Sequence, residues 1–434
     1  MSQHRQPVTQ AFSQGMLYAA IGGALALPTL AVAQDQAVEL PSISVQGAEQ
    51  FDGYQAKKIS SEKFTAPLLD TPRTVDIIPE QLIKDRGATS LQDVLRSTPG
   101  VTLGSGEGGT PTGDRPFIRG YEASTDIFVD GLRDYARGSH ETFNLEAVEV
   151  IKGPSSAYTG RGGTGGSLNL ETKKPKLQNF FEGSAGYGTH NQYRLLADGN
   201  YVFTDSAAFR LNLMRMGGKV PGRDDVKIDR WGIAPTIAFG LGTPTRVTLS
   251  YSHIENNDTP DMGYPFKNAA NPDRVTPLEP DRKNFYGREG IDYRKNHFDT
   301  ATAKIEHDLN DQLSVQNTTR YGTTRNEYLF TRPSFDNCTA TTTNVACRTE
   351  NADLQFTRKD RARFRTTNSL INQTELFGEA FTGSVKHNFI AGVEFGKEDV
   401  YSRDTLEGQG GPGDSIDSFW NPNPNQNWGG RNLA

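Results

Sequence analysis

Residues 148–170 decide the fold of this chain, and they read Val148-Glu-Val-Ile-Lys-Gly-Pro-Ser-Ser-Ala-Tyr-Thr-Gly-Arg-Gly-Gly-Thr-Gly-Gly-Ser-Leu-Asn-Leu170. The apolar residues of 148–151 predict a strand, the glycines of 160–166 predict a hinge, and 167–170 predict a second strand. Thr172-Lys-Lys-Pro175 follows, and a long region of alternating polar and apolar residues comes after it. This order predicts a compact domain that ends near residue 175 and a β-rich region beyond it.

The residues upstream of this stretch predict one strand and two short helices. Thr71–Pro79 has the composition of a strand, and Pro79–Asp85 begins a helix with proline at its start and an acid in its first turn. A second helix is predicted over 91–96, where apolar residues lie three and four positions apart. Thr89-Ser90 would cap this helix, and Pro99-Gly100 would end it.

Short strands complete the predicted domain. They lie at 117–119, 127–129 and 148–151, and Asp130-Gly131 is a turn signal between the last two. Strands and helices mixed in this way predict an α/β domain over residues 65–175.

Two stretches match the spacing G-x-G-x-x-G, at 104–109 and 160–165. A dinucleotide-binding loop follows a strand and opens a helix, so that the helix N-terminus meets the pyrophosphate. Neither stretch precedes a predicted helix, and we do not expect a nucleotide site. The net charge of −6 also argues against a nucleic-acid partner.

The N-terminus predicts an export signal over residues 1–33. His4 and Arg5 precede an apolar run from Met16 to Leu30, and Ala31-Val-Ala33 provides small residues for cleavage after Ala33. The alternative is a membrane anchor, but the run falls short of the ~20 strongly apolar residues that a spanning helix needs.

The region 177–434 predicts antiparallel β-strands with one apolar and one polar face. Phe209, Leu211 and Leu213 alternate with Arg210 and Asn212, and other runs repeat the pattern. The mean hydropathy of −0.61 is compatible with membrane insertion by strands, because only alternate residues of a barrel strand face lipid.

The predicted strands are joined by turns of very unequal length. Short turns are expected at 204–206, 241–243, 310–311 and 382–383, and long polar loops at about 256–295 and 329–363. Short turns on one side and long loops on the other are typical of an outer-membrane barrel, with the short side periplasmic. A soluble β-sandwich is the alternative.

The two cysteines, Cys338 and Cys347, flank a short polar span that a disulfide could close in an oxidising compartment. Two free thiols are the alternative, and a zinc site is less favoured because no second ligand pair lies near. The seven histidines occur singly, so we assign no metal site. No set of residues predicts a catalytic site or an enzyme.

The 65–175 region resembles the plug domain of TonB-dependent outer-membrane receptors. The resemblance rests on Pro-Gly-Val at 99–101, Ile-Arg-Gly at 118–120, Val-Asp-Gly at 129–131 and Lys-Gly-Pro at 152–154. It implies an N-terminal α/β plug domain followed by an antiparallel transmembrane β-barrel, which has ~22 strands in plugged barrels.

Only nine or ten strands can be placed in 177–434, and a barrel of ~8 strands leaves no space for a separate domain. The last residues, 427–434, also predict a loop, whereas family members end on a strand with a terminal aromatic. We therefore expect 177–434 to be the N-terminal part of an incomplete barrel.

Residues 34–64 predict a polar periplasmic tail. Within it, one short extended segment could add to the edge of another sheet. Its residues are Val38, Glu39, Leu40, Pro41, Ser42, Ile43, Ser44 and Val45. The resemblance implies that 38–45 is the TonB box, which pairs with the TonB-ExbB-ExbD energy-transducing complex; an ordinary linker is the alternative.

Asp126-Ile-Phe-Val129 and Arg133-Asp-Tyr-Ala-Arg137 look most like the catecholate siderophore receptors. A ferric tris-catecholate is a bulky trianion with aromatic faces, which guanidinium and phenol groups suit. The resemblance implies iron import as a ferric siderophore, without a resident cofactor. The expected ligand contacts are Arg115, Tyr121, Arg133, Tyr135 and Arg137, with solvated loop arginines as the alternative.

The resemblance also implies that Arg119 and Lys152 lock the plug to glutamates on the barrel wall. Two other functions stay open. One is the same class of receptor with a hydroxamate siderophore, haem or cobalamin as cargo. The other is an outer-membrane signalling or adhesion protein, although a signalling receptor would carry a further folded domain before the TonB box.

Overall fold

The computed structural model describes residues 51–56, 58–61, 63–64, 67–104, 113–136, 138–154, 163–264, 279–335, 354–404 and 415–426. The chain divides into two compact units, Met1–Ser44 and Val45–Ala434, and all of the described residues belong to the second. Among the described residues, no helix combines the length and the apolar character needed to cross a membrane.

The predicted α/β domain contains a five-stranded sheet with the strand order β3-β9-β10-β7-β8. Strands β10 and β7 run parallel, and the other neighbours run antiparallel. The strands are β3 (Thr74–Pro79), β7 (Ile127–Val129), β8 (Leu132–Arg133), β9 (Leu145–Lys152) and β10 (Gly166–Thr172). We refer to residues 67–172 as the plug.

Smaller elements flank this sheet. A three-stranded sheet has the order β4-β5-β6, and strands β1 and β2 pair with each other. Their bounds are β1 (Phe51–Asp52), β2 (Gln55–Ala56), β4 (Val101–Leu103), β5 (Pro116–Ile118) and β6 (Tyr121–Glu122), with the 3-10 helix η1 at Leu68–Asp70.

Both predicted plug helices are confirmed: α1 spans Glu80–Asp85 and α2 spans Leu91–Leu95. The hydroxyl of Ser90 accepts from the Asp93 backbone N–H at 3.2 Å, and the Asp93 carboxylate accepts from the Ser90 N–H at 3.3 Å. This reciprocal capping box satisfies two backbone donors that the helix cannot pair internally. The predicted Asp130-Gly131 turn also forms, with φ values of 48° and 80° between β7 and β8.

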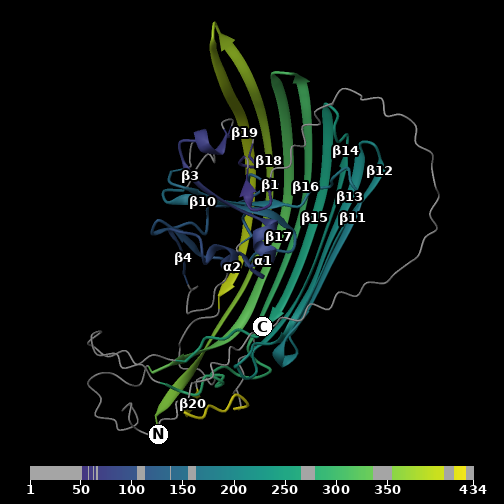
Figure 1. The fold of residues 1–434 in the computed structure, drawn as a ribbon. Coiled ribbons are helices and arrows are strands. Elements are labelled where there is room, and N and C mark those ends of the chain that lie inside the picture. Colours follow the sequence, from purple (N-terminus) through teal and green to yellow (C-terminus); the bar gives the residue numbers. More distant parts are fainter. Residues whose placement is uncertain are drawn as a thin grey trace, which may run out of the picture. The chain divides into compact units, whose positions relative to one another are not determined.

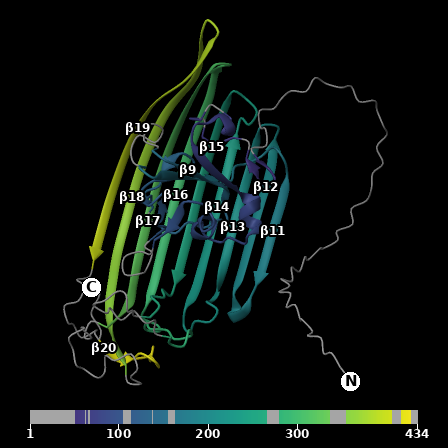
Figure 2. The ribbon, with the colours of Figure 1, turned by 60° about the vertical axis from the view of Figure 1, so that its left-hand side comes forward.

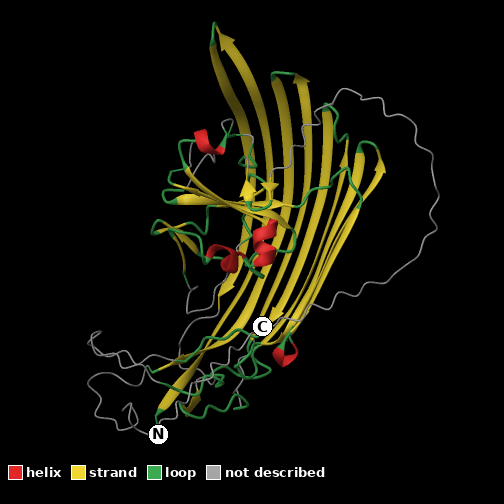
Figure 3. Ribbon diagram, viewed as in Figure 1, coloured by secondary structure: helices red, strands yellow, loops and turns green. Residues whose placement is uncertain are grey.

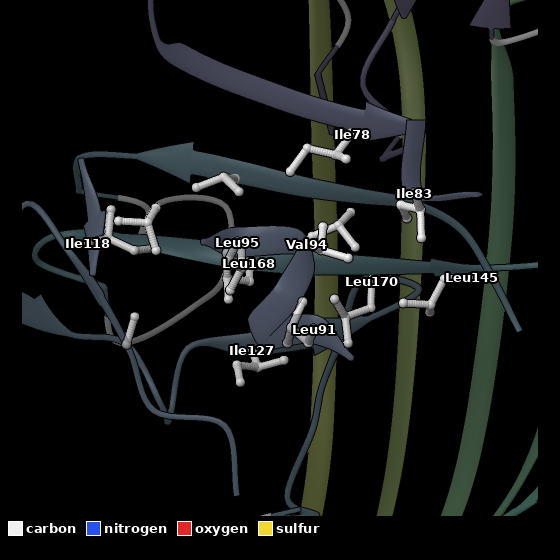
Figure 4. Close-up of a cluster of buried hydrophobic side chains, with 14 residues drawn as sticks. Ile78, Ile83, Leu91, Val94, Leu95, Ile118, Ile127, Leu145, Leu168 and Leu170 are labelled. Atoms are coloured by element: carbon white, nitrogen blue, oxygen red, sulfur yellow. The ribbon is translucent and has the colours of Figure 1, made fainter. Parts of the chain in front are cut away.

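The plug encloses its own hydrophobic core, which Figure 4 shows in close-up. Leu91 and Leu95 of α2 meet Leu168 and Leu170 of β10, and all four are 0% exposed. The spacing of the apolar residues in α2 places them on the face that meets the sheet, which explains why the helix forms here.

The glycine-rich hinge brings β10 against the backbone of its neighbours. A Cβ atom on Gly165 would lie 2.2 Å from the carbonyl oxygen of Ile118, and one on Gly166 would lie 2.3 Å from that of Ile151. Gly166 also has a φ of +147°, which side chains disfavour. Only glycine fits at this junction.

The region after the plug forms a ten-stranded antiparallel sheet in which β11 to β19 pair in chain order and β20 pairs with β18. Figures 1 and 2 show the long strands curving together, and Figure 3 shows that this region is almost entirely strand. We refer to this sheet as the wall. Its strands are β11 (Phe180–Tyr187), β12 (Tyr193–Thr204), β13 (Ala207–Lys219), β14 (Lys227–Phe239), β15 (Thr245–Asp258), β16 (Tyr293–Asn310), β17 (Leu313–Ser334), β18 (Gln355–Thr382), β19 (Val385–Asp404) and β20 (Ser415–Ser418), and the 3-10 helix η3 (Thr189–Asn191) joins the first two.

The two faces of the wall follow the predicted alternation. Arg210 and Asn212 are each 2% exposed, whereas Leu213 is 38% exposed. The four predicted short turns join β12 to β13, β14 to β15, β16 to β17 and β18 to β19. The polar face is therefore covered and the apolar face is open, as in a barrel strand between lumen and lipid.

Long connections between strands occur at both predicted places, and the strands extend a few residues into each predicted range. β15 continues to Asp258 and β16 begins at Tyr293, while β17 continues to Ser334 and β18 begins at Gln355. Strands of 22 and 28 residues exceed the ~9–11 residues that cross a bilayer. The bounds of the second loop differ most, because the polar residues at the ends of β17 and β18 have the composition of a loop.

Aromatic side chains pack together at the ends of β17 and β18 that lie opposite the short turns. Tyr286, Phe335, Phe356 and Phe419 form a buried cluster with Leu354. Such packing orders chain segments that are far apart in the sequence.

Candidate functional site

The plug residues predicted to contact ligand lie in different environments. Tyr121 is 57% exposed. The Arg115 side chain is 39% exposed and forms two hydrogen bonds of 2.9 Å with the Glu122 carboxylate. Arg115 and Tyr121 are thus open to solvent in the described structure, and the guanidinium of Arg115 is already paired.

Arg133 is more enclosed. Its side chain is 11% exposed, donates to the carbonyl oxygen of Thr125 and lies 3.5 Å from the Asp126 carboxylate. Tyr135 and Arg133 both line a cavity, and a Cβ on Gly396 of β19 would lie 3.8 Å from the Tyr135 hydroxyl. Arg137 lies outside the described residues.

The cavity lies between the plug and the wall and has a volume of about 140 Å³. Hydroxyl side chains line its wall side; they come from β14 to β18 and include Thr236, Ser250, Thr302, Thr324 and Ser369. Pockets that hold drug-sized ligands measure ~300–1,000 Å³, so this cavity does not hold a whole ferric siderophore.

His140 joins two plug segments at the edge of this cavity. Its Nδ1 lies 2.7 Å from Asp114 Oδ2, and its Nε2 lies 2.8 Å from Asp134 Oδ2. Burial on its own would lower the pKa of the imidazole, but the two carboxylates outweigh it and raise that pKa to about 10. Relative to an unfolded pKa of ~6.5, this charge stabilises the fold fully below that pH, and the stabilisation is lost as the pH rises through about 10.

Ion pairs connect the plug to the wall, and one of them follows His140 directly. The Glu141 carboxylate accepts from Arg230 of β14 at 2.7 Å, and Arg230 also pairs with Asp258 of β15 at 2.7 Å. Burial raises the pKa of Glu141, and the charge of Arg230 opposes this effect. Another wall cation, Arg320 of β17, donates to the carbonyl oxygen of Val129 at 2.9 Å.

A second ionic group lies where the plug chain passes into the wall. Asp198 of β12 accepts from Lys173 at 2.9 Å and from Arg210 of β13 at 2.8 Å. Arg210 also reaches Glu146 of β9 at 3.2 Å, and Lys173 reaches Glu80 of α1 at 2.7 Å. Lys173, Asp198 and Arg210 are buried, and Glu80 and Glu146 are partly exposed, so the group joins the plug to the wall mainly through its three buried members.

The resemblance implies a different connection, in which Arg119 and Lys152 lock the plug to glutamates on the barrel wall. Lys152 pairs with Asp76 at 2.5 Å and Arg119 donates to Thr74 at 3.3 Å, so both contact the plug itself in the described structure. The predicted partners, glutamates on the barrel wall, are not among these contacts, and that lock stays a prediction.

The chain upstream of the plug is held at two points. The Ser60 N–H donates to Glu149 at 2.6 Å, and the Lys63 ammonium lies 2.6 Å from Glu375 of β18. The predicted TonB box, 38–45, and the predicted disulfide, Cys338 to Cys347, lie outside the described residues.

Replacing Lys63 with methionine is expected to loosen this upstream segment. The Glu375 carboxylate, 5% exposed, would keep only the Gln316 amide at 2.6 Å. We expect severalfold faster hydrogen exchange over residues 58–64, because exchange reports local opening. Lys397→Met, which removes an exposed partner of Asp399, is the control and should leave exchange in 58–64 unchanged. Unchanged exchange in Lys63→Met would show that this pair does not hold the segment.

The plug-to-wall ion pairs could not be predicted from the sequence. Glu141 and Arg230 are 89 residues apart, and no local pattern links them. A charged residue on the covered face of a strand, such as Arg210, is a usable signal, because such a charge needs a partner.

An α/β plug with its own core, tied by ion pairs to the polar face of a long-stranded antiparallel sheet, is the architecture of the N-terminal part of a plugged β-barrel. Residues 67–167 match the family model described as TonB-dependent Receptor Plug Domain. The chain therefore carries the plug of a TonB-dependent receptor, and it is similar to siderophore receptors of that family.

Curated relatives extend the similarity into the wall. The "Probable TonB-dependent receptor BfrD" of Bordetella pertussis is 42% identical over 384 residues, which are 86% of this chain and 50% of that protein. The catecholate siderophore receptor Fiu of Escherichia coli K12 is 39% identical over 357 residues, 80% of this chain and 46% of that protein. The chain spans about half the length of the curated relatives it matches.

Solved structures show the same similarity to siderophore receptors. The closed form of the E. coli ferric-catecholate import receptor Fiu matches with a TM-score of 0.77 and 35% identity, over 87% of this chain and 53% of that one. The siderophore receptor PiuA of Acinetobacter baumannii matches with a TM-score of 0.75 and 32% identity, over 86% of this chain and 54% of that one. The predicted fold, a plug followed by an incomplete antiparallel barrel, is confirmed.

Proposed function

We propose that this chain is the plug-bearing part of an outer-membrane receptor that binds a ferric siderophore, of the catecholate type, and imports it into the periplasm with energy from the TonB complex. The observation that carries the proposal is the plug tied to a polar wall, in a chain that resembles the catecholate receptor Fiu in sequence and structure. The whole activity belongs to the complete receptor.

The proposed ligand surface consists of Arg115, Tyr121, Arg133, Tyr135 and Arg137. A trianionic ferric chelate with aromatic faces would meet guanidinium charge and phenol rings here. The bidentate pair between Arg115 and Glu122 would have to open or shift for Arg115 to bind the ligand directly. Iron is cargo in this proposal, and the protein supplies no covalent chemistry.

Energy would reach the plug through its upstream chain. Residues 38–45 would pair with TonB, and a pull on them would pass through the Ser60 and Lys63 contacts before it reached the plug core. We also propose that the signal at 1–33 directs export of the chain. The open apolar face of the wall would contact outer-membrane lipid. Exposed apolar side chains on that face include Leu213, Phe239, Leu249, Ile305 and Phe389.

The experiment that tests the proposal is iron uptake by siderophore-deficient cells that express the complete gene or an empty vector. Radiolabelled iron is supplied as a ferric tris-catecholate, as a ferric hydroxamate or as haem, and cobalamin is tested in parallel. We expect uptake of the catecholate above the empty vector. Uptake of another cargo alone would reassign the substrate, and binding without any uptake would favour a signalling receptor.

A further inference from the structure

His140 bridges two plug segments that carry proposed ligand contacts. Its backbone N–H donates to Asp114 Oδ2 at 2.8 Å, and its two ring nitrogens reach Asp114 and Asp134 at 2.7 and 2.8 Å. The Asp114 N–H in turn donates to the carbonyl oxygen of Gly138 at 3.1 Å. A neutral imidazole has only one N–H, so two carboxylate partners require the doubly protonated ring.

Both carboxylates are themselves set in place. Asp114 has a side chain that is 1% exposed, and the Asp134 carboxylate accepts from the Ala136 N–H at 2.9 Å. Arg115 follows Asp114 in the chain, and Arg133 and Tyr135 flank Asp134. The bridge therefore ties the segment that contains Arg115 to the segment that contains Arg133 and Tyr135.

Without the two ring contacts, the Asp114 N–H still donates to the carbonyl oxygen of Gly138 and the backbone N–H of residue 140 still donates to Asp114, but the relative position of the two segments is less restricted. A ligand that contacts both would then have to order them on binding, which costs free energy. With the bridge, the ordering is done before the ligand arrives. Glu141, the next residue, is held by Arg230, so the bridge is also fixed to the wall.

We propose that His140 is a positioning residue that holds the segments 113–116 and 133–136 in one arrangement, so that their side chains form a single binding surface for the ferric ligand. This inference rests on the proposed function. His140 does not contact the ligand in this account, and it acts through Asp114 and Asp134.

Two variants test this role in the complete receptor. His140→Ala removes both ring contacts, to Asp114 and to Asp134, and keeps the backbone N–H that donates to Asp114. His253→Ala removes a histidine whose Nδ1 lies 2.7 Å from Asp299 on the wall and whose side chain is also 18% exposed. The affinity for a ferric tris-catecholate is measured by fluorescence quenching, and hydrogen exchange over 113–116 and 133–136 is measured without ligand.

We expect His140→Ala to bind the ferric tris-catecholate roughly tenfold or more weakly, since a broken buried charge pair is costly. We also expect faster exchange in both segments, and partial recovery of affinity when free imidazole is added, because imidazole can replace the bridge. His253→Ala should match the wild type in both measurements. Recovery by imidazole distinguishes positioning from a general loss of folding.

Unchanged affinity and unchanged exchange in His140→Ala would overturn the inference, and so would weaker binding that imidazole does not restore. If His140→Ala does not fold, His140→Gln, which keeps one donor, is measured in its place. If the wild type does not bind the catecholate, the proposed cargo fails, and the ligand-free exchange still decides whether His140 holds the two segments.

Discussion

Replacing Gly166 with alanine is expected to prevent stable folding of the plug. The added Cβ would lie 2.3 Å from the carbonyl oxygen of Ile151, and the backbone φ of +147° is unfavourable for alanine. Backbone strain of ~1–3 kcal/mol and an overpacking cost of ~1–3 kcal/mol together cost ~2–6 kcal/mol, and the upper end of this range equals the whole stability of a marginal domain, ~5 kcal/mol. The Ile151 carbonyl oxygen belongs to the backbone, so it cannot rotate away from the added Cβ as a side-chain atom could.

The measurement is trypsin resistance and thermal unfolding of the plug in the purified complete receptor. Gly87→Ala is the matched control within the plug, because Gly87 also has a positive φ, +61°, but its Cβ would meet nothing within 4 Å. That control should cost only ~1–2 kcal/mol. If the Gly166→Ala plug resisted trypsin as well as the control, residue 166 would not lie in close contact with the backbone of Ile151.

Replacing Asp198 with asparagine is expected to loosen the plug from the wall. Asp198 accepts from Lys173 and from two nitrogens of Arg210, all within 2.9 Å, and its side chain is 8% exposed. Removing the charge leaves buried cations with fewer partners, which costs about 3 kcal/mol. We expect a lower unfolding temperature of the plug and faster proteolysis near Lys173.

Asp308→Asn is the control for this prediction. Asp308 pairs with Arg246 at 2.5 Å, but its side chain is 40% exposed, and exposed pairs contribute ~1 kcal/mol or less. If the two asparagine variants unfolded alike, the buried group around Asp198 would not be the connection that the structure indicates.

The predicted fold was correct where the signals are local. The Ser90 cap, the apolar spacing of 91–95 and the Asp130-Gly131 turn each specify their own element. The alternation around Arg210 correctly assigned the two faces of β13. The long strand ends were missed because local polarity does not distinguish a solvated strand from a loop.

The site was less predictable, because its contacts join distant residues. Arg115 and Tyr135 were chosen by resemblance, and nothing in their neighbourhood showed that His140 would link their segments. The isolated histidines were judged only as metal ligands, which is why the His140 bridge was overlooked. Positions 137, 338 and 347 and the segment 38–45 lie outside the described residues, so their roles stay predictions.

The proposed function requires that a pull on the N-terminal segment drives the plug. The direct test measures uptake of a ferric tris-catecholate by three forms of the complete receptor: the wild type, Ile43→Pro and Ala48→Pro. Proline removes a backbone donor and blocks strand pairing, so we expect Ile43→Pro to abolish uptake while ligand binding persists. Ala48→Pro, outside the proposed TonB box, should transport normally. Undiminished uptake by Ile43→Pro would contradict energy coupling through residues 38–45.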